Sequence, residues 1–198
     1  VINEIKQSNA LHEKVCFQSG NLENNKGRIE FALQFNKGKI KYGKAFCNTV
    51  YNMNGGTHDS GFRSGIAKSI RKYAKNKNNK IVSKASQDDI FDLAAYIISV
   101  YIPNPEFEGQ TKHKLSSSFV QKYCDIFASS IFDEWLNRNP KISKSIINIL
   151  EEKIREKNIY DLNQNVERQN AFRKIRLPGK LSDCTSDKII GTELFIVE

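Results

Sequence analysis

The sequence predicts an α+β fold, a two-layer sandwich in which a mostly antiparallel β-sheet carries helices on one face. Two kinds of pattern predict it. Strand patterns occupy residues 28–36, where apolar and polar residues alternate, and residues 93–102, which form an almost continuous apolar run. Between and after them, apolar residues recur at helical spacing. Elements that each have one apolar face bury it by stacking helices on a sheet, which gives this architecture.

The first two strands are expected to pair as an antiparallel hairpin. The alternation in residues 28–36 is that of a half-buried strand, and residues 36–39, Asn-Lys-Gly-Lys, have a turn composition. Residues 40–51 then return with aromatic and apolar residues on both sides of a glycine. Residues 1–27 are polar and end in a loop composition, so we expect them to be an attachment outside the core.

A glycine-rich loop at residues 54–61 is expected to lead into a helix. Its glycine spacing is neither that of a P-loop nor GxGxxG, so we interpret the glycines as a close-packed helix entry; phosphate binding there is the alternative. The apolar face of the helix should consist of Phe62, Ile66, Ile70 and Tyr73. A second face, the basic stripe, carries four cations without an interleaved carboxylate: Lys68, Arg71, Lys72 and Lys75. This stripe is either a solvated surface or a contact with the DNA backbone.

Helix caps and apolar runs predict the middle of the chain. Ser86 and the aspartates after it cap a short helix, and residues 93–102 follow as a strand buried on both faces, or as a run with a helical start. Serines 116–118 are expected to cap a helix that ends at residues 137–139. Its predicted apolar stripe is Phe119, Tyr123, Phe127, Ile131 and Trp135.

A further helix is expected to begin at Pro140, because proline suits a first helical turn. It runs to about residue 172, and its apolar residues thin out after Asn158. It is either one long C-terminal helix, a strut leaving the domain, or two shorter helices broken near Asn158. The apolar residues 193–198 are expected to form a strand that ends in the carboxylate of Glu198.

The composition describes one folded, basic domain, alone or with pieces of its neighbours. The 198 residues carry a formal net charge of +9, so a polyanion is the first partner to consider. The longest apolar stretch, residues 93–102, ends at Pro103, and the N-terminal residues lack the pattern of a signal peptide. We therefore expect no membrane span and a cytoplasmic location. The 4 cysteines and 3 histidines are scattered, which predicts isolated thiols rather than a zinc site or a catalytic triad.

The functional interpretation depends on the loop at residues 103–115. Pro103 and Pro105 end the preceding apolar run, and Gly109 interrupts the loop before the sequence Gln110-Thr111-Lys112. An ammonium and a carboxamide presented together can bind a phosphate, the lysine through its charge and the amide through hydrogen bonds. From spacing alone, a solvated polar turn is the simpler interpretation.

Three blocks of sequence resemble the B subunits of bacterial type II DNA topoisomerases, and they occur in the order of that family. They are GGTHDSGFR at 55–63, EFEGQTKHKLSSS at 106–118, and LPGKLSDCTS with TELFIVE within 177–198. The resemblance extends from about residue 28 to residue 198. It implies a transducer domain with the fold of domain 2 of ribosomal protein S5.

The resemblance also implies a division of the chain and a role for several residues. Residues 1–27 would be the exit from an ATPase domain, residues 28–172 the transducer domain, and residues 173–198 a linker with the first strand of a Toprim domain. Gln110 and Lys112 would contact the terminal phosphate of ATP held by the preceding domain. The basic stripe would line a cavity through which DNA passes. Glu198 would bind metal only together with the rest of the Toprim domain.

The implied function is that of a fragment of an ATP-dependent DNA topoisomerase, which relays ATP binding and hydrolysis to DNA strand passage. The whole protein would use ATP and Mg²⁺, act with an A subunit on DNA, and dimerise through its B subunits. The fragment has no nucleotide pocket of its own, so alone it should be inactive and bind no cofactor. Residues 87–92 and Thr192 favour topoisomerase IV over DNA gyrase. A non-enzymatic nucleic-acid-binding module of the S5-like kind is the more remote alternative.

Overall fold

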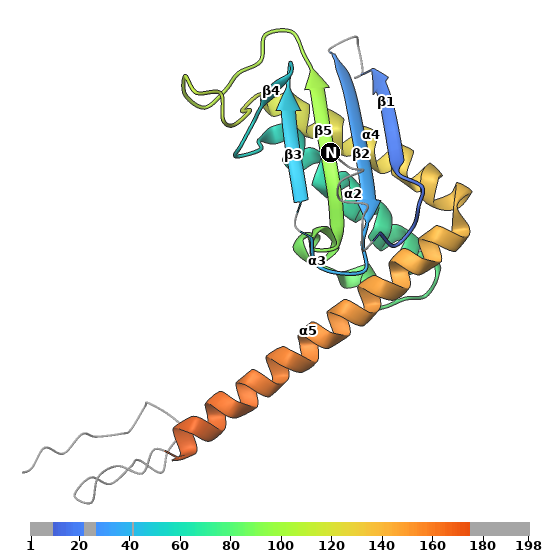
Figure 1. Cartoon of the computed structure of the whole chain (residues 1–198), viewed down its shortest axis with the longest axis vertical. Helices are drawn as coiled ribbons and strands as arrows, with labels where there is room; N and C mark the ends of the chain where they lie inside the picture. The colour runs from blue at the N-terminus through green and yellow to red at the C-terminus, as the bar shows by residue number, and fades with distance from the viewer. Residues whose placement is uncertain (1–9, 22–26, 41, 175–198) are drawn as a thin grey trace, which may run out of the picture. The chain divides into compact units, whose positions relative to one another are not determined.

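The computed structural model of the chain describes residues 10–21, 27–40 and 42–174 (Figure 1). The chain divides into two units, Val1–Arg155 and Glu156–Glu198, and the sheet and its covering helices belong to the first. The described residues form a five-stranded mixed sheet and four α-helices, which confirms the α+β class. None of these helices is long and apolar enough to cross a membrane.

The sheet has the strand order β1-β2-β5-β3-β4. Its strands are β1 (Cys16–Asn21), β2 (Arg28–Phe35), β3 (Tyr42–Cys47), β4 (Val50–Tyr51) and β5 (Ala94–Tyr101). The pairs β1–β2, β2–β5 and β3–β4 are antiparallel, whereas β3 runs parallel to β5. The sheet is therefore mostly antiparallel, as the sequence predicts.

The predicted hairpin between residues 28–36 and 40–51 is wrong, because β5 lies between β2 and β3. The backbone of the intervening turn shows why. Asn36 N donates to Leu93 O at 2.8 Å, and Ile40 N donates to Asp92 O at 2.9 Å, so the turn bonds to the segment that leads into β5. The most apolar strand takes the central position, where it buries most surface. Alternation within a strand shows which residues face the core and says nothing about its neighbour.

Residues 16–21 also correct the sequence analysis, which placed residues 1–27 outside the core. They form the edge strand β1, with Cys16 opposite Leu33 and Asn21 opposite Arg28. Cys16 is 1% exposed and belongs to the core. The polar residues of β1 misled the prediction because an edge strand with one solvated face needs few apolar residues.

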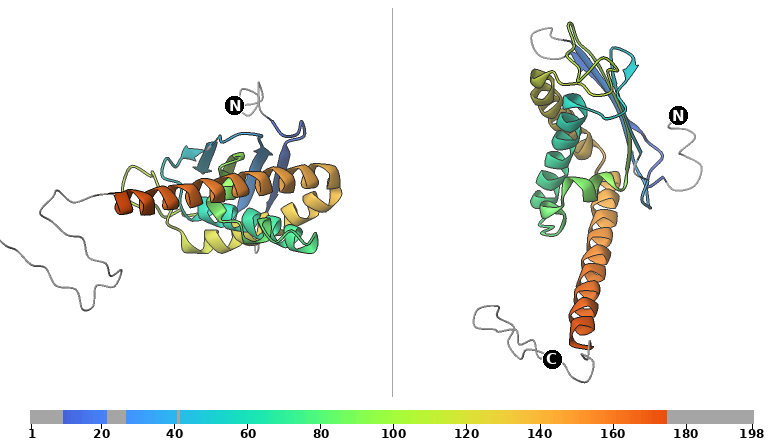
Figure 2. Two further views of the ribbon diagram at one scale, coloured as in Figure 1. Left: turned by 90° about the horizontal axis from the view of Figure 1, so that it is seen from below. Right: turned by 90° about the vertical axis from the view of Figure 1, so that its left-hand side faces the viewer.

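The helices cover one face of the sheet, as expected. The right-hand view of Figure 2 shows the sheet nearly edge-on, with α2 (Thr57–Asn76) and α4 (Ser118–Arg138) on the same side. No described helix covers the other face, and β5 is not fully buried there, so the expectation that β5 is buried on both faces is wrong. Its inward residues Ile98 and Val100 are fully buried, whereas Ile97 and Ser99 on the opposite face are only partly covered.

Helices α2 and α4 pack closely because two glycines of α2 face α4. A Cβ atom on Gly61 would lie 2.2 Å from Gln121 O, and one on Gly65 would lie 2.5 Å from Asp125 O. Only glycine permits this approach of two backbones. On the sheet side of α2, the predicted apolar face is confirmed, since all of its members are buried: Phe62, Ile66, Ile70 and Tyr73.

The predicted apolar stripe of α4 is displaced by about one residue. The buried face consists of Val120, Cys124, Ala128, Phe132, Trp135 and Leu136. Among the predicted residues, Trp135 is buried, Phe119 is 37% exposed, and the remaining three lie at the margin of the core. The close glycine contacts leave little space where α4 crosses α2: a Cβ atom on Gly65 would also lie 3.0 Å from the small side chain of Ala128.

The last helix, α5, spans Pro140–Lys174. Its first half contributes Ile146, Ile147 and Leu150 to the core. Residues 155–160 are exposed, including Ile159 and Tyr160 at 59% and 63%. The predicted strand at residues 193–198, with Glu198, lies outside the described residues.

Candidate functional site

The 103–115 loop folds back on itself after β5. Phe107 pairs with Leu115 in an antiparallel bridge, and Glu108 N donates to Lys114 O at 2.9 Å. Glu106 N donates to Ser117 Oγ at 2.9 Å. Ser117 is the N-cap residue of α4, but its side chain serves the loop and makes no cap hydrogen bond to the helix, contrary to expectation. The base of the loop is thus fixed, and its tip, residues 109–113, is exposed.

Hydrogen bonds join this loop to the entry of α2. Leu115 N donates to Gly55 O at 3.2 Å, and Thr57 N donates to Leu115 O at 3.0 Å. A Cβ atom on Gly56 would lie 2.4 Å from Leu115 O, and φ there is +139°. Gly56 therefore lets two backbones touch, which confirms the interpretation of the glycines as a close-packed helix entry.

Two further bonds reach the tip of the loop. Asn52 Nδ2 donates to Lys112 O at 2.7 Å, and Asn54 N donates to His113 O at 3.0 Å. Lys112 has φ +54°, in the left-handed region that lysine seldom adopts. The loop and the start of α2 consequently form one hydrogen-bonded unit, although more than fifty residues separate them in the sequence.

The charges of the loop distinguish its lysines. Lys114 Nζ forms an ion pair with Glu108 Oε1 at 2.9 Å. Lys112 is exposed and makes no ion pair within the described chain; its Nζ lies 5.9 Å from the ring centre of Phe107. Gln110 is also exposed. Lys112, with the nearby amide of Gln110, therefore retains a cation and donors that can bind an external anion.

The structure divides the basic stripe into paired and unpaired cations. Lys68 Nζ lies 2.5 Å from Asp125 Oδ2, and Lys72 Nζ lies 2.5 Å from Asp133 Oδ2, both on α4. Arg71 Nε donates to Ala85 O at 2.8 Å. The sequence of α2 has no carboxylate among these four cations, but in the folded protein α4 supplies two. Of the four cations, Lys75 makes no contact to a carboxylate within the described residues.

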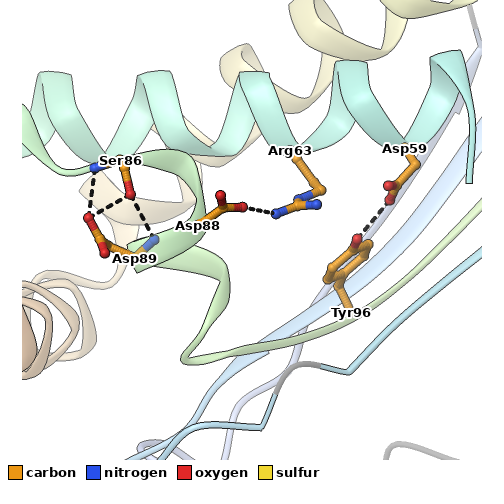
Figure 3. A network of polar contacts seen from close by, with 6 residues as sticks. All are labelled: Asp59, Arg63, Ser86, Asp88, Asp89 and Tyr96. Atoms are coloured by element: carbon orange, nitrogen blue, oxygen red, sulfur yellow. Dashed lines mark hydrogen bonds and ion pairs between the residues drawn. The ribbon is translucent and has the colours of Figure 1, made fainter.

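A polar network between α2, α3 (Gln87–Phe91) and β5 was not predicted (Figure 3). Tyr96 Oη donates to Asp59 Oδ1 at 2.7 Å, and Arg63 Nη2 donates to Asp88 Oδ1 at 2.9 Å. Burial raises the pKa of Asp59, and the Tyr96 and Arg63 contacts oppose this rise. Burial, and then the Asp59 carboxylate, raise the pKa of Tyr96. The signal in the sequence was a tyrosine inside an apolar strand, whose hydroxyl needs a partner when buried.

The predicted caps of α3 are confirmed in detail. Ser86 Oγ accepts a hydrogen bond from Asp89 N at 3.1 Å, and Asp89 Oδ2 accepts one from Ser86 N at 3.1 Å. This capping box fixes the entry of α3, and therefore places Asp88 opposite Arg63.

His58 and the three described cysteines are buried. His58 is 0% exposed and neither ring nitrogen has a hydrogen-bond partner among the described residues; burial lowers its pKa to about 4. Burial raises the pKa of Cys47 to about 11 and that of Cys16 to about 12, so these thiols are poor nucleophiles. Within the described residues, no group of three or more His, Cys, Asp and Glu side chains could hold a metal ion. The arrangement therefore leaves the exposed tip of the 103–115 loop as the place in the described chain that can bind an anion.

Comparison with known proteins gives matches over most of the chain. A family model described as DNA gyrase B matches residues 1–161. The chain is 41% identical over 155 residues to the B subunit of DNA topoisomerase 4 from Caulobacter vibrioides, covering 78% of this chain and 22% of that protein. It is 36% identical over 175 residues to the B subunit of DNA gyrase from Mycoplasma pneumoniae, covering 86% and 27%. The 43K ATPase domain of Thermus thermophilus gyrase B has a similar fold, with a TM-score of 0.74 and 21% identity over 83% of this chain and 44% of that one. The chain thus spans about a quarter of the length of the first two relatives.

Proposed function

Because this chain belongs to the DNA gyrase B family, we propose that it is the transducer domain in the B subunit of a type II DNA topoisomerase. In the whole protein it would relay ATP binding and hydrolysis to DNA strand passage. Two relatives, named as the B subunits of DNA topoisomerase 4 and of DNA gyrase, support this proposal at 41% and 36% identity. The chain's part in the reaction would be binding and relay, through the exposed loop that carries Lys112 and Gln110.

The observation that carries the proposal is the exposed ammonium of Lys112, which makes no ion pair with the residues that the structure describes, on a loop that is hydrogen-bonded to α2. Lys112 and Gln110 would contact the terminal phosphate of ATP held by an ATPase domain. A charged hydrogen bond to that phosphate exists only while the phosphate is present. Loss of the phosphate on hydrolysis would release the tip of the loop. The bonds of Gly55 and Thr57 to Leu115 would carry this change to the start of α2.

The division of the chain follows from the same proposal. Residues 1–27 would include the exit from the ATPase domain, although β1 within them belongs to the transducer sheet. Residues 28–172 would form the remainder of an S5-like transducer domain, and residues 173–198 the linker and first strand of a Toprim domain. Helix α5 would carry movement toward the DNA gate. Mg²⁺ would act with ATP in the ATPase domain and with Glu198 in the Toprim domain.

The basic stripe would contact DNA as it passes through the protein. Lys68 and Lys72 are 57% and 67% exposed in spite of their ion pairs, whereas the side chains of Asp125 and Asp133 are 21% and 24% exposed. The two ammonium groups are therefore accessible to a DNA phosphate, which would take the place of Asp125 or Asp133 as their partner. Lys75, which has no such partner among the described residues, would bind phosphate without an exchange.

The test replaces Lys112 by Ala in the full-length protein and measures ATP turnover with DNA and the A subunit present. A hydrogen bond to a charged group contributes about 1.5–3 kcal/mol, so kcat/KM should fall by roughly 10- to 100-fold. Lys114→Ala is the matched control, because Lys114 lies on the same loop but is already paired with Glu108. Unchanged turnover in Lys112→Ala, or an equal loss in Lys114→Ala, would refute the phosphate contact.

Topoisomerase IV is the more specific proposal, and the 41% identity to the Caulobacter vibrioides protein supports it. DNA gyrase is the second candidate, supported by the 36% identity to the Mycoplasma pneumoniae protein. The reconstituted holoenzyme distinguishes them on relaxed circular DNA. Introduction of negative supercoils in the presence of ATP would establish a gyrase, whereas relaxation and decatenation without supercoiling would establish topoisomerase IV.

A further inference from the structure

We propose that Asn52 is a positioning residue for Lys112: its side-chain amide holds the Lys112 backbone in the conformation that presents the ammonium to a nucleotide's terminal phosphate. This inference rests on the function proposed above for Lys112. It concerns a residue outside the 103–115 loop, in the segment between β4 and α2.

Asn52 is itself held rigidly. Its main-chain N donates to Ala45 O of β3 at 2.9 Å, and its main-chain O accepts from Gly55 N at 2.9 Å. The side chain is 1% exposed. Both main-chain groups are thus tied to the sheet and to the entry of α2, so the amide has one fixed direction from which to reach the loop.

The amide acts on one residue of the loop. Nδ2 donates to Lys112 O at 2.7 Å, and Oδ1 has no partner among the described residues. The remaining bonds between the two segments involve backbone groups of His113 and Leu115. Within the described chain, Asn52 therefore makes the only side-chain hydrogen bond to the backbone of residues 109–114.

Lys112 needs such support because its φ of +54° is unfavourable for a residue with a Cβ atom. Strained backbone persists where surrounding contacts fix it. Without the amide, the Lys112 peptide can rotate toward a negative φ, which redirects Cβ and the whole side chain. The ammonium would then have to be repositioned each time ATP binds, and binding would weaken. The bond thus supplies preorganisation to a side chain that otherwise has four rotatable bonds in solvent.

The experiment measures how strongly the full-length protein prefers a non-hydrolysable ATP analogue over ADP. ADP lacks the terminal phosphate, so the ratio of the two dissociation constants reports the contacts to that phosphate, among them the one proposed for Lys112. Asn52→Ala should reduce this preference by about three- to tenfold, the effect of one hydrogen bond, with ADP affinity unchanged. Asn52→Leu should give the same loss, because leucine has a similar size and shape and removes the donor without adding a charge.

Asn48→Ala is the matched control. Asn48 lies in the same turn region, has φ +47°, and donates through Nδ2 to Ile102 O at 2.9 Å, away from the loop tip. Its replacement weakens the same part of the sheet and should leave the nucleotide preference unchanged. A reduction in Asn48→Ala as large as in Asn52→Ala would overturn the inference, because it would indicate a general loss of structure.

A double-mutant cycle with Lys112→Ala separates this inference from the function on which it rests. If Lys112→Ala lowers the preference and Asn52→Ala lowers it no further in that background, Asn52 acts through Lys112. If Lys112→Ala lowers the preference but Asn52→Ala does not, or the effects add, the positioning role is overturned and the function of Lys112 stands. If Lys112→Ala leaves the preference unchanged, the proposed function fails and the inference fails with it.

Discussion

His58 should make the stability of this domain depend on pH in the acidic range. It lies in the first turn of α2, is 0% exposed, and finds no hydrogen-bond partner for either ring nitrogen in the described part of the chain. Burial disfavours the charged imidazolium and lowers the pKa from 6.5 to about 4. In the unfolded chain the same ring takes up a proton near pH 6.5. Below that pH the unfolded state binds more protons than the native state, so the free energy of unfolding falls as pH falls.

The size of the effect follows from the two pKa values. A difference of about 2.5 units between 6.5 and about 4 corresponds to roughly 3 kcal/mol once both states are protonated. Between pH 7 and pH 5 about 2 kcal/mol of this should be lost. Urea unfolding of the 198-residue chain can measure it, followed by the fluorescence of Trp135, the single tryptophan, which is 6% exposed.

The comparison variant is His58→Gln, which has no charge to gain across this range. Burial also lowers the pKa of His12 and raises that of Asp59. His12 therefore makes the free energy of unfolding rise with pH, whereas Asp59 makes it fall with pH. Both contributions are present in the wild type and in the variant, and they cancel in the difference between the two curves. From pH 7 to pH 5, the free energy of unfolding of the wild type should fall by about 2 kcal/mol more than that of His58→Gln. Parallel curves would refute the assignment of a buried neutral imidazole to His58.

Two further predictions concern the helices. Gly65→Ala places a methyl group against Asp125 O, 2.5 Å away, and should lower the free energy of unfolding by about 1–3 kcal/mol. The control Ser64→Ala, on the same helix, should change this free energy by less than about 0.5 kcal/mol. Equal losses in the two variants would argue against close packing of α2 on α4. For the basic stripe, Lys75→Gln in the full-length protein should lower the slope of log affinity for DNA against log salt concentration by about 0.9. Retention of the full slope after all four cations are neutralised would exclude the stripe as a DNA contact.

Local sequence patterns predicted the individual helices and strands better than they predicted which strands pair in the sheet. The alternation of residues 28–36 and the helical spacing from Phe62 to Tyr73 both report which side of an element faces the core, and both were correct. The predicted pairing of β2 with residues 40–51 was wrong. Strand β5, some sixty residues later, has a more apolar sequence and pairs with that edge of β2 instead. Such competition depends on the whole chain, whereas a period depends only on neighbouring residues.

The residues that surround the candidate site were the least predictable from the sequence. Gln110 and Lys112 stand out in a loop that follows two prolines. Nothing local indicates that Lys114 forms an ion pair with Glu108 while Lys112 forms none with the described residues. Asn52 lies sixty residues from Lys112 and looks like an ordinary loop residue. The carboxylates that face Lys68 and Lys72 come from α4, more than fifty residues away. Sequence shows which charges exist, and only the fold shows which of them are already paired.

The pairing of these charges bears on how a change at the loop could reach DNA. Helix α2 is bonded at its start to the loop that carries Lys112, and it packs through Gly61 and Gly65 on the backbone of α4. Closely packed helices move together or slide by discrete steps, and they deform little. A displacement of the loop should therefore alter the alignment of α2 with α4. The ion pairs of Lys68 and Lys72 with aspartates of α4 connect these two helices. In the proposed function, such a shift would let the two lysines exchange Asp125 and Asp133 on α4 for a DNA phosphate.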